Sequence, residues 1–441
     1  MTQNLALGSL CALFLTACAS SDDGTAPSGS DAGADAAAGE LAGFELIVPQ
    51  SLVEGRPFAM TVRAQSTLGG TLTTWSGNVA LSASRGAIEP AQVSVSGGEV
   101  TVQATLSREG TVTITLTGGG TSSSATPDVS AMRWVRDPAQ DAVAKAGGVG
   151  SWRYAGWRGA SVATSDGGLV AAFATGATLT DGIGDVIGIA TSPDGLTWTV
   201  DPEEPVLMPA DFGANGLANP HLVRAPDGTW HLWLETLTGD AGSAVHGIRH
   251  ATSTDGRHFT PSGCPLFGAQ AFGDWTSAGV GAPAAISRED GSFALWFTAW
   301  HQEVDGLVTR IGRTEGLVGA TCEASWTTAS IVVERGAKQT WSSFRVSSPH
   351  VWQDANVWRM LYVGTSRIDS APSLGYATSA DGLAWEVSPS NPVLVHSLWD
   401  GQGVQSPSVA ILGDTPALFF EGLAAIDKRS RLGRAVPEQA P

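Results

Sequence analysis

Two glutamates stand at equivalent places in the second half of the chain. Glu235 ends the apolar run HLWLE, and Glu421 ends the similar run ALFFE. A pair of carboxylates is the usual machinery for cleaving a glycosidic bond, because one protonates the leaving oxygen and the other activates water or attacks the sugar. The two glutamates are therefore the candidates for acid–base chemistry. Pairing with a neighbouring arginine is the alternative role for each.

Polar side chains also gather around a recurring proline. The proline motif reads NPH at Asn219, APA at Ala282, SPH at Ser348 and SPS at Ser406. Side chains in or beside this motif, together with a histidine after the run ALWFTAW, could bind the hydroxyl groups of a ligand. This predicted substrate-binding set is Asn219, His221, His301, Arg345, His350 and Gln405. Packing inside the fold explains each histidine equally well.

Metal and cofactor chemistry are not indicated by the motifs. His221, His301 and His350 carry imidazoles, but they lack the close spacing, such as HxxxH, that brings two ligands to one metal. The chain has neither a Gly-rich phosphate loop that leads from a strand into a helix nor a nucleophile elbow. We therefore predict no metal and no cofactor.

A repeat defines the elements that must position these residues. The segment IGIATSPDGLTW at 187–198 returns as IRHATSTDGRHF at 248–259 and LGYATSADGLAW at 374–385, and shorter copies begin at Ile311 and Leu432. Each copy predicts a strand, an Asp-Gly turn and a second strand with an aromatic residue. With the proline motif and apolar run that precede it, the unit has four strands and recurs about every 60 residues, which is typical of a β-propeller.

The fifth unit lacks a fourth strand of its own. In the other units the fourth strand carries an aromatic residue, which is Trp198, Phe259, Trp326 or Trp385. The segment MRWVRDP at 132–138 matches LTWTVDP at 196–202, so Trp134 supplies the missing aromatic. We expect the strand around Trp134 to pair with the strand around Leu432. This pairing would close a five-bladed propeller over residues 131–441 and remove its exposed edges.

The Asp-Gly turns of the repeat invite a catalytic interpretation that we do not favour. Asp194, Asp255 and Asp381 each precede a glycine in the turn of one repeat. An aspartate hydrogen-bonds the backbone just after it, and glycine supplies the positive φ that such turns need. These aspartates are predicted to be structural.

The order of proline motif, apolar run and IGxAxSxDGxxW resembles the arabinanase, levansucrase and invertase superfamily, which contains glycoside hydrolase families 32, 43, 62 and 68. The resemblance implies a propeller whose catalytic carboxylates belong to Asp-Pro and Glu-Gly-Pro motifs at the mouth. The corresponding residues of this chain are Gly159, Asn219, Ala282, Ser348 and Ser406. None is a carboxylate, so the resemblance favours a carbohydrate-binding propeller. The alternative is a divergent glycosidase, arabinosidase-like or xylosidase-like, that acts on plant or microbial polysaccharide.

The chain before the propeller has three predicted parts. Residues 1–18 end in LTAC, which resembles the lipobox of bacterial lipoproteins and implies a signal peptide and a lipid on Cys18. Residues 19–42 are rich in Ser, Asp, Gly and Ala and are expected to be a disordered linker. Residues 43–128 alternate β-branched runs with Gly-rich turns and resemble bacterial Ig-like domains, so we expect a β-sandwich.

The cysteines indicate the cellular compartment of the protein, and its charge limits the classes of molecule that it could bind. Outside the signal segment the chain has Cys264 and Cys322, which are predicted to form a disulfide after export. A formal charge of −18 without a basic stripe argues against nucleic acid and anionic membrane surfaces as partners. We expect an all-β monomer that is held in the outer membrane or at the cell surface by its lipid alone. An oligo- or polysaccharide is its expected partner.

Overall fold

The computed structural model describes residues 39–438 apart from short segments. These segments are 139–140, 180–181, 240–243, 263–265, 305, 319–325, 355–356, 367–370 and 414. The expected signal peptide, Cys18 and most of the linker lie outside the described residues. So does the expected disulfide between Cys264 and Cys322, and all of these stay predictions.

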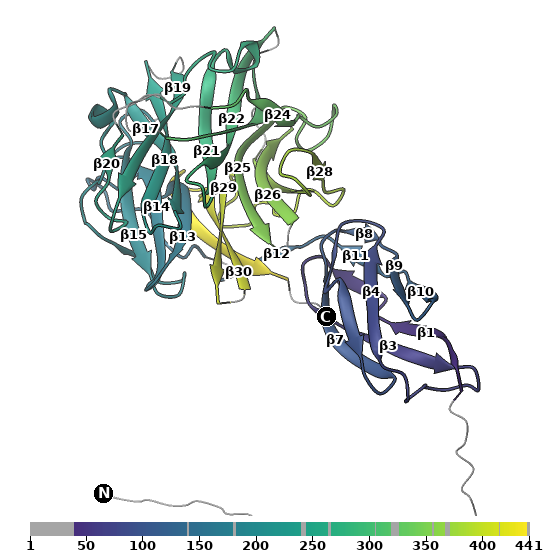
Figure 1. Ribbon diagram of the computed structural model, residues 1–441. Helices are drawn as coiled ribbons and strands as arrows, with labels where there is room; N and C mark the ends of the chain where they lie inside the picture. Colours follow the sequence, from purple (N-terminus) through teal and green to yellow (C-terminus); the bar gives the residue numbers. More distant parts are fainter. Residues whose placement is uncertain are drawn as a thin grey trace, which may run out of the picture.

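The first domain is a β-sandwich, as predicted. One sheet has the order β1-β3-β7-β5, the other has the order β10-β9-β4-β6, and a small sheet β2-β11-β8 lies at the end nearest the second domain (Figure 1). The strands are β1 (Leu41–Ile47), β2 (Ser51–Val53), β3 (Phe58–Ser66), β4 (Gly77–Ala83), β5 (Ile88–Glu89), β6 (Gln92–Val95), β7 (Glu99–Leu106), β8 (Gly110–Thr111), β9 (Ile114–Gly118), β10 (Thr121–Ala125) and β11 (Asp128–Ser130). Alternation decides which face is buried: in β3, Met60, Val62 and Ala64 are buried and Ala59 is exposed.

The second domain is a five-bladed β-propeller, and each blade has four strands. Blade I consists of β13 (Arg158–Ser165), β14 (Gly168–Thr175), β15 (Val186–Ser192) and β16 (Thr199–Val200). Blade II consists of β17 (Gly216–Arg224), β18 (Trp230–Thr238), β19 (Val245–Ser253) and β20 (Thr260–Pro261). Blade III consists of β21 (Gly279–Ser287), β22 (Phe293–Glu303), β23 (Gly306–Gly316) and β24 (Ser330–Val333). Blade IV consists of β25 (Arg345–Asp354), β26 (Val357–Thr365), β27 (Ser373–Ser379) and β28 (Trp385–Val387).

Blade V closes the ring with strands from both ends of the propeller. It consists of β29 (Val404–Leu412), β30 (Thr415–Leu423), β31 (Ser430–Pro437) and β12 (Trp134–Arg136). The outer strand β12 pairs antiparallel with β31, and Trp134 lies opposite Pro437. The predicted closure by the strand around Trp134 is therefore confirmed. Only Ala131, Met132 and Arg133 separate β12 from the last strand of the sandwich, so closure of the propeller is directly linked to the first domain.

The glycine in the repeat IGxA makes room for an aromatic ring of the neighbouring strand. In blade I, Gly188 lies opposite Phe173, and a Cβ on Gly188 would stand 2.6 Å from the Phe173 ring. In blade III, Gly312 lies opposite Phe297, and a Cβ there would stand 2.7 Å from that ring. The glycine is thus required by packing rather than by the conformation of a turn.

Blade II is the exception that supports this explanation. Its copy of the repeat reads IRHA, so Arg249 replaces the glycine. The residue opposite Arg249 is Leu234 rather than an aromatic residue. The two positions are complementary, because the smaller leucine leaves the space that the longer arginine side chain needs.

The repeated Asp-Gly turns are structural, as predicted. In the first copy the Ser192 hydroxyl accepts the N–H of Gly195 at 2.8 Å, and Asp194 Oδ1 accepts the N–H groups of Leu196 and Thr197 at 2.8 and 2.9 Å. The copies at Asp255 and Asp381 make the corresponding backbone hydrogen bonds. These bonds lower the pKa of Asp194 and Asp381 below the usual value for aspartate.

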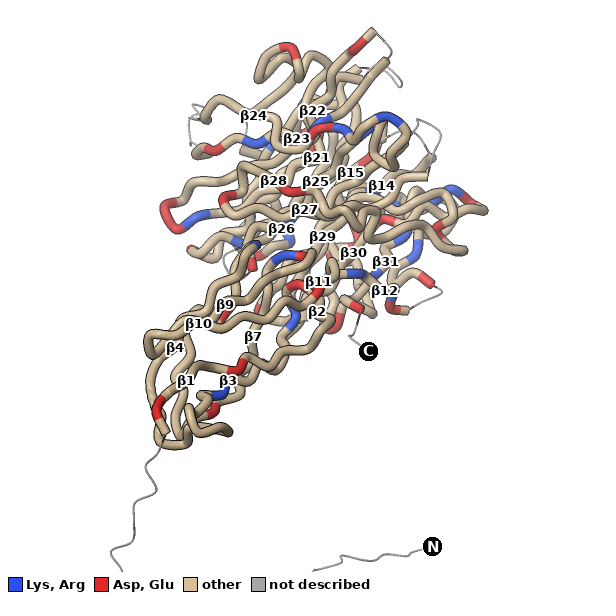
Figure 2. The backbone as a smooth tube through the Cα atoms, turned by 90° about the vertical axis from the view of Figure 1, so that its right-hand side faces the viewer, with Lys and Arg blue, Asp and Glu red and all other residues tan. Residues whose placement is uncertain are grey.

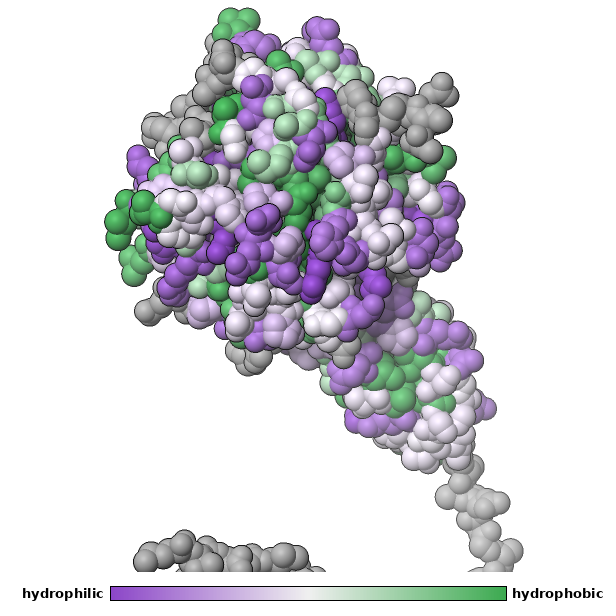
Figure 3. Space-filling model, turned by 90° about the vertical axis from the view of Figure 1, so that its left-hand side faces the viewer, coloured by the Kyte–Doolittle hydropathy of each residue, from purple (hydrophilic) through white to green (hydrophobic). Residues whose placement is uncertain are grey.

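Charge and hydropathy are mixed over the surface of the molecule. Lysine, arginine, aspartate and glutamate alternate along the tube in Figure 2, without a continuous basic stripe in that view. The face in Figure 3 likewise mixes polar and apolar side chains on both domains. Among the described residues, no helix has the length and apolar character needed to cross a membrane.

Candidate functional site

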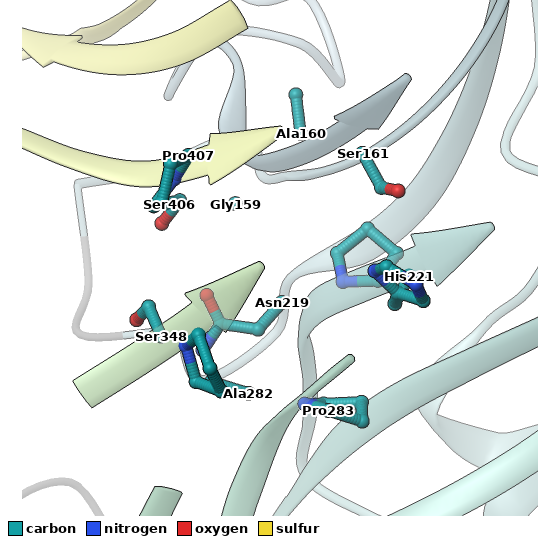
Figure 4. A pocket seen from close by; sticks show the side chains of 12 residues that line it. Gly159, Ala160, Ser161, Asn219, His221, Ala282, Pro283, Ser348, Ser406 and Pro407 are labelled. Atoms are coloured by element: carbon teal, nitrogen blue, oxygen red, sulfur yellow. The ribbon is translucent and has the colours of Figure 1, made fainter. Parts of the chain in front are cut away.

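The five inner strands of the propeller share a bulge at the proline motif. The ladder between the first and second strand of every blade slips at this point. The residue before the proline, or before Ala160 in blade I, has a left-handed backbone. These residues and their φ angles are Gly159 (57°), Asn219 (43°), Ala282 (42°), Ser348 (48°) and Ser406 (51°). They surround the propeller axis (Figure 4). Non-glycine residues are strained in this conformation, so each bulge needs support from its surroundings.

Two glutamates and a threonine supply that support. Glu235 Oε2 accepts the N–H of Ala282 from blade III at 2.8 Å and the side-chain amide of Asn219 from its own blade at 2.8 Å. In the same way, Glu421 Oε2 accepts the N–H of Gly159 from blade I at 2.8 Å and the hydroxyl of Ser406 at 3.3 Å.

Blade III uses a smaller side chain for the same purpose. Thr298 Oγ1 accepts the N–H of Ser348 from blade IV at 2.9 Å. Thr298, Glu235 and Glu421 occupy one register position, at the end of the second strand where the funnel opens, which we call the mouth. Three acceptors thus hold all five left-handed residues around the axis.

The remaining oxygen of each glutamate is also bonded. Glu235 Oε1 accepts a hydrogen bond from Nδ1 of His246 at 2.5 Å, and Glu421 Oε1 accepts the hydroxyl of Ser430 at 2.5 Å. The two glutamates are 2% and 3% exposed. Burial alone raises the pKa of Glu235, but His246, Asn219 and the Ala282 N–H outweigh it, and the net pKa lies below the usual value. Glu235 is therefore ionised at neutral pH, and both of its carboxylate oxygens accept hydrogen bonds.

In four of the five blades, the residue after the proline, or after Ala160 in blade I, ties its blade to the next; in blade III this residue is Ala284, which has no polar side chain. Ser161 Oγ accepts the N–H of Leu222 at 3.0 Å, and Ser408 Oγ accepts the N–H of Val162 at 2.9 Å. The ring of His221 donates from Nε2 to the carbonyl of Ala285 at 3.1 Å. These bonds join blades I and II, V and I, and II and III.

His350 makes the corresponding bond between blades IV and V. Its Nε2 accepts the N–H of Val409 at 2.9 Å, and its ring lies 5.6 Å from that of His221. Burial lowers the pKa of His221 to about 4 and the pKa of His350 to about 3. Both rings are buried and neutral, so the geometry gives these two predicted binding residues a structural role. Ligand binding by either one stays an untested prediction.

A cleft of about 480 Å³ opens at the mouth beside this ring of bonds. Its walls come mainly from blades V, I and II. The residues that line it include Arg158, Asn219, Asp185, Glu235, His246, Trp300, Gln405, Glu421, Lys428 and Ser430. The structure therefore brings both predicted glutamates, Asn219 and Gln405 into one cleft.

Arg345 and His301 lie apart from that wall. Arg345 does not line the cleft itself, but its guanidinium lies 5.9 Å from the ring of Trp300, which does. His301 lies on the strand that leads away from the cleft, where its Nδ1 donates to the carbonyl of Asp274 at 2.7 Å. His301 is not among the residues that line the cleft.

Asp185 is a cleft residue that sequence reasoning missed. It precedes β15, is 1% exposed, and accepts a hydrogen bond from Arg158 at 2.6 Å through Oδ2. Its Oδ1 has no hydrogen-bond partner among the described residues. Burial raises the pKa of Asp185 to about 6, although Arg158 opposes the shift. Asp185 lies two residues before the first copy of the repeat, but the other copies have no carboxylate at the matching position, so the sequence pattern did not single it out.

The aromatic wall of the cleft was also missed. Trp300 stacks on His246, with ring centroids 4.4 Å apart and planes at 13°. Arg345 covers another part of the indole, and its own pKa is lowered by burial. The sequence did contain a signal for Trp300. It ends the run ALWFTAW two residues after Thr298, and residues two apart on a strand lie on the same face. Among the described residues, no group of three His, Cys, Asp or Glu side chains could hold a metal ion.

The fold is a five-bladed propeller, and it is similar to solved structures that are described as glycoside hydrolases. One similar solved structure is described as a glycoside hydrolase, with 14% identity, a TM-score of 0.54 and coverage of 70% of this chain and 93% of its own. Another is a putative glycoside hydrolase from Bacteroides ovatus, with 14% identity, a TM-score of 0.52 and coverage of 68% and 95%. A third is an endo-1,4-beta-xylanase from Bacteroides thetaiotaomicron, with 15% identity, a TM-score of 0.50 and coverage of 64% and 94%. The fold inferred from the sequence resemblance is thus confirmed.

Sequence comparison adds nothing to this likeness. No protein-family model matches the chain, and no curated protein sequence matches it. At this identity the likeness to the solved structures concerns the fold alone.

Proposed function

We propose that the propeller binds carbohydrate at its mouth without cleaving it. The observation that carries this proposal is the full engagement of Glu235 and Glu421, which hold left-handed residues around the axis. A general acid or base must exchange a proton with the substrate, and a carboxylate that is buried among three donors is poorly placed to do so. The cleft itself supports binding, because it combines an aromatic wall with polar side chains such as Gln405.

A second candidate function is supported by Asp185. A divergent glycosidase needs a carboxyl whose pKa is close to the working pH, and burial brings the pKa of Asp185 to about 6. Its free Oδ1 and its place on the cleft wall add to that argument. Its bond to Arg158 argues against it, since the arginine holds the carboxylate in the charged form.

The setting of the protein is a proposal as well. The LTAC sequence supports export and lipid attachment at Cys18, with the propeller held away from its membrane by the linker and the sandwich. We propose a monomer whose contact with the membrane is the lipid alone. Loss of membrane association in Cys18→Ser would support this anchor, and retention would contradict it.

The test measures binding and cleavage separately. Xylan oligosaccharides are the first probe because one structural neighbour is a xylanase, and mannan and arabinan oligosaccharides follow. We expect retention of an oligosaccharide without release of reducing ends. Gln405→Ala should weaken binding by about tenfold, whereas His301→Ala, outside the cleft, should leave the affinity unchanged. Reducing-end release that falls by about 10²–10⁴ in Asp185→Asn or Glu421→Gln would establish the glycosidase instead.

A further inference from the structure

A second and larger cleft lies between the two domains. Its volume is about 630 Å³, within the range of roughly 300–1,000 Å³ that is typical of ligand sites. Its lining residues come from the sandwich and from blades IV and V, at the end of the inner strands opposite the mouth. Figure 1 shows the sandwich next to this side of the propeller. The sandwich contributes Arg56 and Thr105, and the propeller contributes Trp352, Gln353 and Asp354.

Buried charges fix the two walls of this cleft relative to each other. Glu54 of the sandwich pairs with Arg359 of the propeller at 3.1 Å, and both side chains are 1% exposed. The hydroxyl of Tyr376 bonds to the same guanidinium, and Glu54 also accepts the N–H of Glu109 at 3.0 Å. Separating the domains would leave charges without partners, which is strongly unfavourable for buried groups.

Contacts elsewhere in the domain interface, outside the lining of the cleft, also hold the two domains together. Glu386 of blade IV pairs with Arg85 at 3.2 Å and with Arg108, and the hydroxyl of Ser390 donates to Glu109 at 3.0 Å. The sandwich is therefore docked at several points around the cleft. The cleft is a fixed feature of the docked domains, and a ligand would find it already formed.

The chemistry of the walls selects the kind of ligand. The indole of Trp352 and the side chains of Met132 and Pro416 give an apolar surface, while the carboxylate of Asp354 is half exposed and lies 3.5 Å from Nε of the buried Arg359. Arg56 is the one cation among the described lining residues, and its Nη2 donates to the carbonyls of Pro437 and Glu438 at 2.9 and 3.0 Å. An anionic ligand would meet the Asp354 carboxylate with little free positive charge to balance it.

We propose that this inter-domain cleft binds a neutral saccharide at a site separate from the mouth. A sugar ring offers an apolar C–H face to the Trp352 indole and hydroxyl groups to Asp354, Gln353 and the nearby threonines. This combination matches the mixed walls of the cleft better than a purely apolar or an anionic ligand does. The site would give the protein a second hold on a polysaccharide, on the side of the propeller that faces the sandwich.

The test uses residues 19–441 labelled with fluorotryptophan and observed by fluorine NMR. The resonances of Trp352 and Trp300 are assigned by Trp352→Phe and Trp300→Phe, so each cleft has its own reporter. The probes are D-xylose, L-arabinose, D-mannose and D-galactose, each titrated to well above the millimolar range expected of a weak single-ring ligand. We expect at least one sugar to shift the Trp352 resonance in a saturable way.

Two surface variants and a control complete the experiment. Asp354→Asn and Gln353→Ala should each weaken the Trp352 response by about tenfold. Asp166→Asn removes an exposed carboxylate of blade I that pairs with Arg224 of blade II, and it should change nothing at Trp352. Absence of a Trp352 shift with all four sugars, or a shift that survives both variants, would overturn the second site. The Trp300 resonance tests the mouth independently, so failure of one site is distinguished from failure of the other.

Discussion

At the mouth end of the second strand, blades II and V carry a glutamate where blade III carries Thr298 and blade IV carries Val363. Glu235 and Glu421 each hold two left-handed residues, one of the next blade and one of their own. Thr298 holds one, and Val363 offers no acceptor. Where the preceding blade lacks an acceptor, the left-handed residue is Asn219 or Ser406, whose side chain reaches the glutamate of its own blade.

This comparison teaches that carboxylates at a propeller mouth can hold the bulges of the inner strands in place. The residue at this position matches the number of left-handed residues that it holds, and glutamate is used where it accepts one backbone N–H and one side-chain donor. A resemblance to hydrolases directs attention to any carboxylate near the axis. The hydrogen bonds of the carboxylate decide whether it is available for chemistry.

The largest expected effect is the loss of a glutamate that supports two bulges. Glu235→Leu should lower the free energy of unfolding by about 3–5 kcal/mol, because it leaves the Ala282 N–H and the Asn219 amide without an acceptor. Glu235→Gln keeps an acceptor oxygen and should cost clearly less. Denaturant unfolding at neutral pH measures both. Equal, small losses in the two variants would contradict the structural role.

The second effect is the dependence of stability on pH, which comes from the buried histidines that tie blades at the axis and from His250 of blade II. Below pH 6.5 the unfolded chain binds protons on His221, His350 and His250, whereas burial holds their folded pKa values at about 4, 3 and 3. Each proton that the unfolded chain binds and the folded chain does not bind lowers the free energy of unfolding by about 1.4 kcal/mol for every unit by which the pH falls. Asp185 acts in the opposite direction below pH 6, because its folded pKa is raised.

The net result is a loss of stability as the pH falls. Between about pH 6 and 4 the three histidines bind protons only in the unfolded chain, and Asp185 binds one only in the folded chain. The difference is two protons, so the free energy of unfolding should drop by about 3 kcal/mol per pH unit. Unfolding curves at a series of pH values measure this slope. His350→Gln removes one titrating ring and should make the slope shallower. A slope that is unchanged in this variant would show that acid acts elsewhere.

The third effect tests the single-acceptor blade. Thr298→Val keeps the shape of a fully buried side chain but leaves the N–H of Ser348 unpaired, which should cost about 1–3 kcal/mol. Thr309→Val is the control, because Thr309 is a fully buried threonine of the same blade whose hydroxyl has no hydrogen-bond partner among the described residues. If Thr298→Val costs no more than this control, hydrogen bonding at this position does not support the bulge.

The sequence could predict what repeats and could not predict what occurs once. Five blades, closure through Trp134 and structural Asp-Gly turns all rest on patterns that return along the chain. The mouth is built where the copies differ, as with His246 and Trp300 on adjacent blades or Asp185 before a single repeat. His221 and His301 both follow repeated motifs, yet one lies at the axis and the other outside the cleft, since the direction of a side chain depends on the bulge and the strand it belongs to.

The smallest expected effect concerns the strain that all five bulges share. Ala282→Gly should raise the free energy of unfolding by about 0.5 kcal/mol, because relief of the left-handed strain at φ 42° slightly exceeds the backbone entropy that glycine loses on folding. Ala284→Gly is the matched control, since Ala284 is also buried in β21 but is not among the residues with positive φ. It should lower stability by about 0.5–1 kcal/mol, because glycine brings the entropy cost without any relief of strain. Precise denaturant titrations of the two variants side by side measure the difference. Two changes of the same sign and size would mean that the left-handed conformation at the proline motif stores no strain, and that the glutamates of blades II and V hold the mouth for another reason.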